Sequence, residues 1–281
     1  MKPILLKLMV CLAMTASIFA SSHAWAQPDA APHLQERSPD LRAAADHMRR
    51  LTLSDREGGD IDLIERPLLA YADPARINSK GSVWAWGRRG RPVAFLELFQ
   101  GDEKDKTWVQ AVTLTSPRQV RLAIPGGGVW QPAEADFVSR PIPNAPTPDE
   151  RTSIRLRQLK ELARRFSAHE FWDPDNSRFE LRLLVQPVLR YSDVGADLHD
   201  GAAFLIAHDT NPEAVLLIEA LGPSMKEARW HFSLARSSNA EAHVELDGKE
   251  VWKCDRSGPA NNGPTRNYWL FSSQTETSLD D

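Results

Sequence analysis

Cysteine is nearly absent from this chain, which holds Cys11 and Cys254 among its 281 residues. Cys11 lies in an N-terminal segment that we expect to be cleaved, so the mature chain keeps one cysteine and forms no internal disulfide. We expect Cys254 to be an unreactive, half-buried thiol, and a free reactive thiol or an intermolecular bridge is the alternative. Packing rather than cross-links is therefore expected to hold the fold together.

Long apolar runs and an excess of one charge are also missing. No later stretch approaches the roughly 20 apolar residues that a membrane-spanning helix requires. The chain has 34 basic and 38 acidic side chains, and loss of the two lysines near its start leaves 32 against 38, a net charge of −6. This mildly acidic balance argues against nucleic acid or an acidic membrane surface as the main partner.

The sequence lacks complete catalytic and metal-binding motifs. His169-Glu170 opens the run HEFWD, which has no second histidine four residues on to complete a helical zinc pair. The segment 173–176 begins like a calcium loop but lacks its glycine and its distal glutamate. The glycines at 126–128 are not followed by Lys-Ser/Thr, and there is no GxSxG elbow. We expect no metal and no cofactor.

What is present at the N-terminus resembles a secretory signal peptide over 1–26. Two lysines precede an uncharged, mostly apolar run of 13 residues, Leu8–Ala20. Small residues at Ala24 and Ala26 then favour cleavage before Gln27. We predict that the protein is exported to the periplasm or secreted, without a transmembrane segment in its mature chain.

Two parts of the sequence match at a nearly fixed offset. The run RPLLAYAD from Arg66 aligns with QPVLRYSD from Gln186, 120 residues later. After a two-residue insertion, the match continues through two pairs of tryptophans, Trp108 with Trp230 and Trp130 with Trp252. We interpret this match as an internal duplication.

Each copy is predicted to be one helix followed by an antiparallel sheet of five or six strands, an α+β fold with pseudo-twofold symmetry. Ser38-Pro39-Asp40 and Thr147-Pro148-Asp149 are parallel helix starts, with a hydroxyl cap and proline at the first position. Short alternating runs separated by turn residues follow. The predicted boundaries are signal peptide 1–26, polar lead-in 27–37, first repeat 38–131, proline-rich connection 132–146, second repeat 147–253, and polar tail 254–281 with a candidate last strand at 267–272.

The second predicted helix is rich in basic residues. We interpret them as a solvated helix face, and a face for an anionic partner is the alternative. These residues are Arg151, Arg155, Arg157, Lys160, Arg164 and Arg165.

Glu97 and Glu219 each interrupt an apolar strand at an aligned position. Because a strand alternates its faces, each glutamate can simply point to solvent. Alternatively, each is buried and paired with an arginine such as Arg121 or Arg236, as buried charge requires. A third interpretation is a catalytic carboxylate pair of the glycoside-hydrolase kind.

Trp84 and Trp86 lie two residues apart and therefore on one strand face. They suit either core packing or, if exposed, a sugar-stacking platform, and their aligned residues Phe204 and Ile206 favour the core. Histidines concentrate in the second copy, where we interpret them as turn and surface residues, with general-base catalysis as the alternative. They are His199, His208, His231 and His243.

Four stretches resemble a family of exported proteins from planctomycete-type bacteria. They are RLRQLKELARRFSA, ELRLLVQPVLRYSD, TNPEAVLLIEA and LDGKEVW. The resemblance covers most of the mature chain and is strongest from Arg155 to Trp252. It implies export and a shared architecture, and it implies no activity and no site residues.

These features favour a non-catalytic exported binding or interaction module of the cell envelope, whose partner is an unidentified ligand or envelope protein. An exported hydrolase using Glu97 or Glu219 with a histidine is one alternative, and a purely structural envelope protein is another. The candidate ligand-binding residues are Glu97, Glu219, Trp84, Trp86 and His231.

Overall fold

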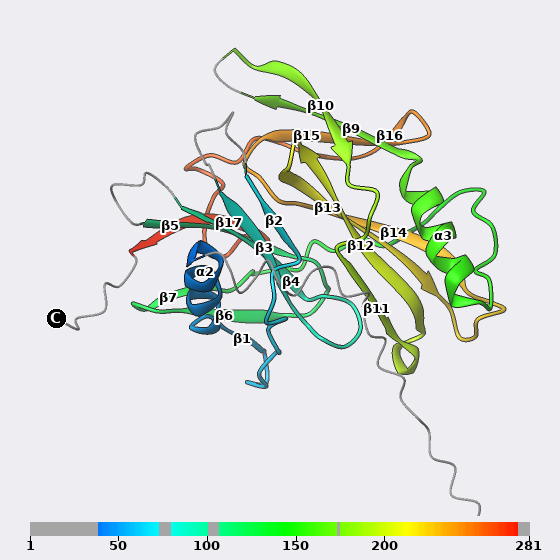
Figure 1. Ribbon diagram of the computed structural model, residues 1–281, viewed down its shortest axis with the longest axis horizontal. Helices are drawn as coiled ribbons and strands as arrows, with labels where there is room; N and C mark the ends of the chain where they lie inside the picture. Colours follow the sequence, from blue (N-terminus) through cyan, green and yellow to red (C-terminus); the bar gives the residue numbers. More distant parts are fainter. Residues whose placement is uncertain (1–38, 73–79, 101–106, 173–174, 275–281) are drawn as a thin grey trace, which may run out of the picture.

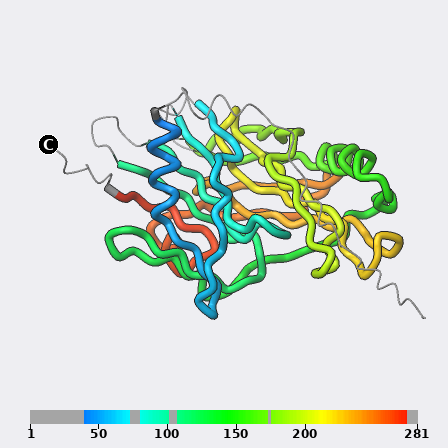
Figure 2. Tube along the Cα trace, turned by 60° about the horizontal axis from the view of Figure 1, so that its bottom comes forward, coloured from blue at the N-terminus to red at the C-terminus, as the bar shows by residue number. Residues whose placement is uncertain are grey.

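The computed structural model describes residues 39–72, 80–100, 107–172 and 175–274. Within these ranges the chain is mostly β, with 49% of residues in strands and 11% in helices. The strands form three antiparallel sheets, and the two α-helices lie toward opposite ends of the molecule (Figures 1 and 2). No helix in these ranges is long and apolar enough to cross a membrane.

The N-terminal part of the chain, together with one strand from the C-terminal tail, builds two of the sheets and one helix, α2 (Pro39–Arg49). The five-stranded sheet has the order β17 (Tyr268–Gln274), β5 (Thr107–Leu114), β4 (Ala94–Gln100), β3 (Gly81–Trp86) and β2 (Leu69–Tyr71). The three-stranded sheet has the order β1 (Thr52–Asp55), β6 (Val120–Ile124) and β7 (Gly128–Trp130).

The rest of the chain builds a nine-stranded sheet and the second helix, α3 (Thr152–Ala163). The sheet has the order β16 (Lys249–Cys254), β15 (Glu241–Leu246), β9 (Phe166–Trp172), β10 (Ser177–Leu183), β12 (Leu198–His208), β13 (Asn211–Leu221), β14 (Arg229–Arg236) and β8 (Arg140–Pro141). Off this path, β11 (Leu189–Asp193) pairs with β12 and leads into a short 3₁₀ helix, η2 (Val194–Ala196).

Strand β10 joins the two halves of the curled nine-stranded sheet. The first residues of β10 pair with β9, and the last two residues of β10, Arg182 and Leu183, pair with β12. The curled sheet and α3 enclose one apolar core, which includes Phe204 and Trp230. A second core lies between the five-stranded sheet, α2 and the three-stranded sheet. A third core joins residues of β3 and β4 with residues of β11, β12 and β13, and so packs the two large sheets together.

The prediction of a duplicated helix-plus-sheet unit is wrong. Strands cross the predicted boundaries: β17 comes from the C-terminal tail and pairs with β5, and β8 comes from the proline-rich connection and pairs with β14. The segment directly after α3 forms strand β9, which the sequence pattern did not predict. Tertiary pairing therefore makes the fold a set of curled antiparallel sheets, with few helical residues, in place of two equal α+β units.

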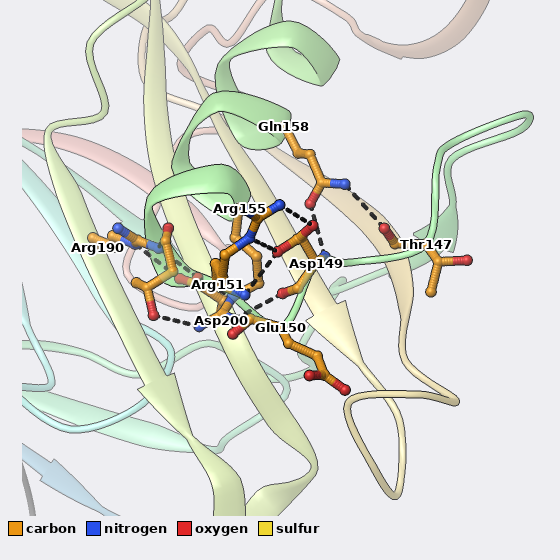
Figure 3. A network of polar contacts seen from close by, with 9 residues as sticks. Thr147, Asp149, Glu150, Arg151, Arg155, Gln158, Arg190 and Asp200 are labelled. Carbon is orange, nitrogen blue, oxygen red and sulfur yellow. Dashed lines mark hydrogen bonds and ion pairs between the residues drawn. The ribbon is translucent and has the colours of Figure 1, made fainter.

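An ion network ties the start of α3 to the nine-stranded sheet (Figure 3). Arg155 donates from Nε to Asp200 at 2.6 Å and from Nη1 to the carbonyls of Asp149 and Glu150. Arg190 donates to both carboxylate oxygens of Asp200, at 2.9 and 2.5 Å. Arg155 is 7% exposed. The basic face of this helix therefore includes a buried anchor, contrary to the expectation of a solvated face.

Candidate functional site

The two candidate glutamates lie on strands that are buried on both faces. Glu97 on β4 is 4% exposed and Glu219 on β13 is 1% exposed. Alternation places them on the faces of their sheets that meet in the third core, beside Phe95 and Leu217. A solvent-facing role does not fit this burial, and a buried charge requires partners.

Glu219 joins the two large sheets. Arg91, in the turn between β3 and β4, reaches across and donates to both of its carboxylate oxygens, at 2.8 and 2.5 Å. Tyr191 on β11 donates its hydroxyl to the same carboxylate at 3.0 Å. The guanidinium of Arg91 also lies 4.5 Å from the ring centre of Phe137. The partner of Glu219 is therefore Arg91, and not Arg236 as the sequence suggested.

Charge and burial shift the pKa values in this cluster. Burial acts to lower the pKa of Arg91, but its hydrogen bonds to Glu219 and the carboxylate charge outweigh burial and raise it. Burial, assisted by the charge of Glu219, raises the pKa of Tyr191 well above its usual value. The cluster therefore holds a hydrogen-bonded ion pair and a neutral phenol.

A matching tyrosine–glutamate pair lies in the five-stranded sheet. Tyr71 on β2 donates its hydroxyl to Glu97. In both pairs a glycine lies under the tyrosine ring, Gly81 under Tyr71 and Gly201 under Tyr191, so closely that an added Cβ would overlap the ring. The aligned sequence positions thus make the same local contacts in two sheets, as expected of scaffold residues.

His231 lies directly opposite Glu219 on the neighbouring strand β14. Its Nδ1 is 3.4 Å from the hydroxyl oxygen of Ser139, and burial lowers its pKa, against the opposing effect of the Glu219 charge. Because both oxygens of Glu219 already accept bonds from Arg91 and Tyr191, the structure does not assemble a Ser–His–carboxylate relay here.

Trp84 and Trp86 are packed in the core. They are 0% and 1% exposed and contribute to the core under α2. The indole N–H of Trp84 donates to the hydroxyl of Ser82 at 2.9 Å. No face of either ring is available to stack on a sugar.

A groove of about 390 Å³ lies where the two ends of the nine-stranded sheet approach each other, and we call it the seam groove. Strand β16 is one end of the sheet and β8 is the other. Arg140 of β8 bridges them, because its Nη1 donates to the carbonyl of Val251 at 2.6 Å. A β-bulge at Val251, between the pairs of β15 with β16, accompanies this contact.

The seam groove has an apolar floor and a charged rim. Its floor is formed by side chains that also border the core inside the curled sheet, namely Phe232, Leu234, Val251 and Trp252. Its rim carries two acids and two bases, namely Asp136, Glu250, Arg140 and Lys253. Val138, half exposed at 50%, lies at the rim as well. Neither Glu97 nor Glu219 lines this groove.

A histidine pair lies close to the seam groove. His243 on β15 bonds Glu250 at 2.7 Å and Glu241 at 3.1 Å, and its ring stacks on that of His169 at 4.8 Å. Burial acts to lower the pKa of His243, but its bonds to Glu250 and Glu241 outweigh burial and raise it. Burial lowers the pKa of His169. In the part of the chain that the structure describes, no group of three or more His, Cys, Asp or Glu is arranged to hold a metal ion.

Comparison with known proteins finds no family model, no curated protein and no solved structure that matches this chain. The resemblance to exported planctomycete-type proteins therefore stays a prediction. The signal peptide, its cleavage between Ala26 and Gln27, and the lead-in lie outside the described residues.

Sequence analysis missed the residues that line the seam groove. Val138 and Arg140 lie in the proline-rich connection, which has no periodic pattern that would indicate a strand. In the sequence match, Trp252 aligns with Trp130. The two differ in the structure, since Trp130 is 0% exposed whereas Trp252 is partly exposed and lines the groove.

Proposed function

We propose that the protein is exported and acts as a non-catalytic binding module, with the seam groove as its binding site for an extended segment of another protein. The observation that carries this proposal is the geometry of the groove, an apolar floor between two ends of one sheet. Export rests on the signal-peptide pattern of residues 1–26.

The position of the groove beside strand β14 favours a peptide as the ligand. Strand β14 pairs with β8 at His231 and Phe232, while β14 itself continues to Arg236. An extended chain laid in the groove can place alternate apolar side chains against Leu234 and Trp252. Charges of both signs on the rim favour a peptide with mixed charge over a strongly acidic or basic one.

A catalytic role for Glu219 has less support, since Arg91 and Tyr191 occupy both carboxylate oxygens. A nucleophile or general base needs an accessible lone pair facing a substrate. The buried pair instead resembles a structural link between sheets.

Two exposed valines provide a matched test. Val138 lines the seam groove and is 50% exposed, whereas Val194 in η2 is 66% exposed and does not line it. Decapeptides selected from a random display library on the wild-type protein should lose about tenfold or more in affinity on Val138→Asp, because a carboxylate at the rim costs desolvation. Val194→Asp should bind them within about twofold of wild type.

The measurement is peptide Kd by fluorescence anisotropy, with urea unfolding to verify that both variants remain folded. Peptides that bind the wild-type protein and Val138→Asp equally would show that they use another surface. Failure to select any peptide would contradict a peptide-binding groove. Export is tested separately by sequencing the N-terminus of exported protein, which should begin at Gln27.

A further inference from the structure

A second groove, of about 630 Å³, lies beside the three-stranded sheet, and we call it the arginine groove. The side chains of Val120, Leu122 and Ile124 on β6 pack into the core. Because strand residues alternate between faces, Arg121 points to the opposite, outer side, and it is exposed there. Arg56, just after β1, lines the same groove.

The wall of the arginine groove is fixed by backbone hydrogen bonds between two distant segments. The N–H of Gln131 donates to the carbonyl of Pro264 at 2.7 Å, and the N–H of Ala133 donates to Thr265 at 3.0 Å. The indole N–H of Trp130 also donates to the carbonyl of Arg266 at 2.8 Å. These hydrogen bonds make the wall of the groove part of the fold.

Positive charge is in excess inside this groove. Asp55 is the one acid among its lining residues, and it already faces Arg118 at 3.4 Å and accepts the backbone N–H groups of Glu57 and Gly59. Arg56 donates to the neutral side chain of Gln119 at 3.1 Å. Among the described residues, Arg121 has no acidic partner.

We infer that the arginine groove binds a small anionic ligand, with its carboxylate or phosphate group held by Arg56 and Arg121. Guanidinium groups suit planar or tetrahedral oxyanions because they donate two hydrogen bonds in parallel. The residues that line the groove include Val129, Pro132 and Pro264 and no aromatic ring, which favours an aliphatic body over a stacked base or sugar. The groove volume is in the range of small-molecule sites. This site is independent of the seam groove.

The test uses three six-carbon probes, hexanoate, hexyl phosphate and neutral hexanol, titrated by ligand-observed NMR. We expect at least one anion to bind the wild-type protein with a Kd of about 1 mM or tighter, and hexanol to bind at least about tenfold more weakly. The tighter of the two anions identifies the preferred head group. Raising the salt from about 0.05 to 0.5 M should weaken the anion severalfold.

Arg121→Gln should weaken anion binding about tenfold, whereas Arg89→Gln should leave it unchanged. Arg89 is a matched control because it is also exposed and lies in the β3–β4 turn, outside the groove. Both variants should unfold like wild type, since surface substitutions of this kind change stability little. The inference is overturned if neither anion binds below about 10 mM, if hexanol binds as well as the anions, or if Arg121→Gln binds like Arg89→Gln.

Discussion

The sheet interface at Glu219 and the rim of the seam groove both combine arginine with a carboxylate, yet they use charge in opposite ways. Glu219 is 1% exposed, and both of its oxygens accept bonds from residues of other strands or turns. Glu250 at the groove is 50% exposed at its side chain, and Arg140 there bonds a backbone carbonyl. Charge without solvent must be fully paired and therefore fixes the scaffold, whereas charge at a wet rim is stabilised by water as well as by its neighbours.

The largest effect that separates these regions should come from removing the buried carboxylate charge. Glu219→Gln leaves Arg91 partly buried without its counter-charge, and we expect a loss of about 3 kcal/mol in the free energy of unfolding. Glu250→Gln at the exposed rim should cost less than about 1 kcal/mol. Urea unfolding at neutral pH measures both variants.

A double replacement sharpens this comparison. Arg91→Met with Glu219→Leu removes both charges and keeps apolar volume, and it should recover most of the stability lost in Glu219→Gln. If Glu219→Gln and Glu250→Gln lower the free energy of unfolding by the same amount, the Arg91–Glu219 ion pair does not hold the two sheets together. If the double variant remains as unstable as Glu219→Gln, packing of Arg91 rather than charge holds the sheets together.

A medium effect is expected from the glycines under the two tyrosine rings. Gly81→Ala and Gly201→Ala should each lower the free energy of unfolding by about 1–3 kcal/mol, because the new methyl group overlaps a buried ring. Gly258→Ala is the control, since nothing lies within 4 Å of the added Cβ. Unfolding curves for the three variants measure these losses.

Equal stability of Gly201→Ala and Gly258→Ala would show that Tyr191 can leave its place over Gly201. The bond from Tyr191 to Glu219 would then be dispensable, and the contrast between a rigid interface and an open rim would fail. Unequal losses of stability in Gly81→Ala and Gly201→Ala would instead show which of the two tyrosine–glutamate pairs is packed more tightly over its glycine.

Much of the strand content could be predicted from local pattern. Alternating or continuous apolar runs indicated β3 to β6 and β12 to β15, and proline at the first helical position indicated the start of α2 at Pro39. The start of α3 was placed too early, because Thr147 resembles a cap while the helix begins at Thr152. The two-residue strand β8 has no pattern of its own, since it exists through its partner β14.

The candidate site could be predicted from the sequence less well than the fold. The aligned glutamates could be recognised as unusual, but their burial and the identity of Arg91 depend on how two sheets pack. Arg91 lies in the turn RRGR, where a charged residue ordinarily faces solvent. A turn that docks on another sheet leaves no periodic signal, so sequence could not distinguish Arg91 from Arg121 or Arg236 as the partner of Glu219.

The smallest effect concerns protonation of the histidines in the two regions. His243 near the groove should titrate above its ordinary pKa, since its bonds to Glu250 and Glu241 outweigh burial, whereas burial should hold the pKa of His231 at the sheet interface below that value. A pKa raised in the folded state means that His243 stabilises the fold below its unfolded pKa, and that this stabilisation is lost as pH rises through the folded pKa. His231 acts in the opposite sense, and its contribution is lost as pH falls through its lowered folded pKa.

Histidine resonances followed by NMR between about pH 5 and 9, across the ordinary histidine value, measure both groups directly. Glu250→Gln should lower the pKa of His243, because it replaces a charged acceptor with a neutral one, and should leave His231 unchanged. A His243 that titrates below His231 in the wild-type protein would contradict the assigned bonds to Glu250 and Glu241. A shift of both histidines in Glu250→Gln would show that the rim and the interface are electrostatically coupled, so that the exposed acid at the groove also acts on the buried pair.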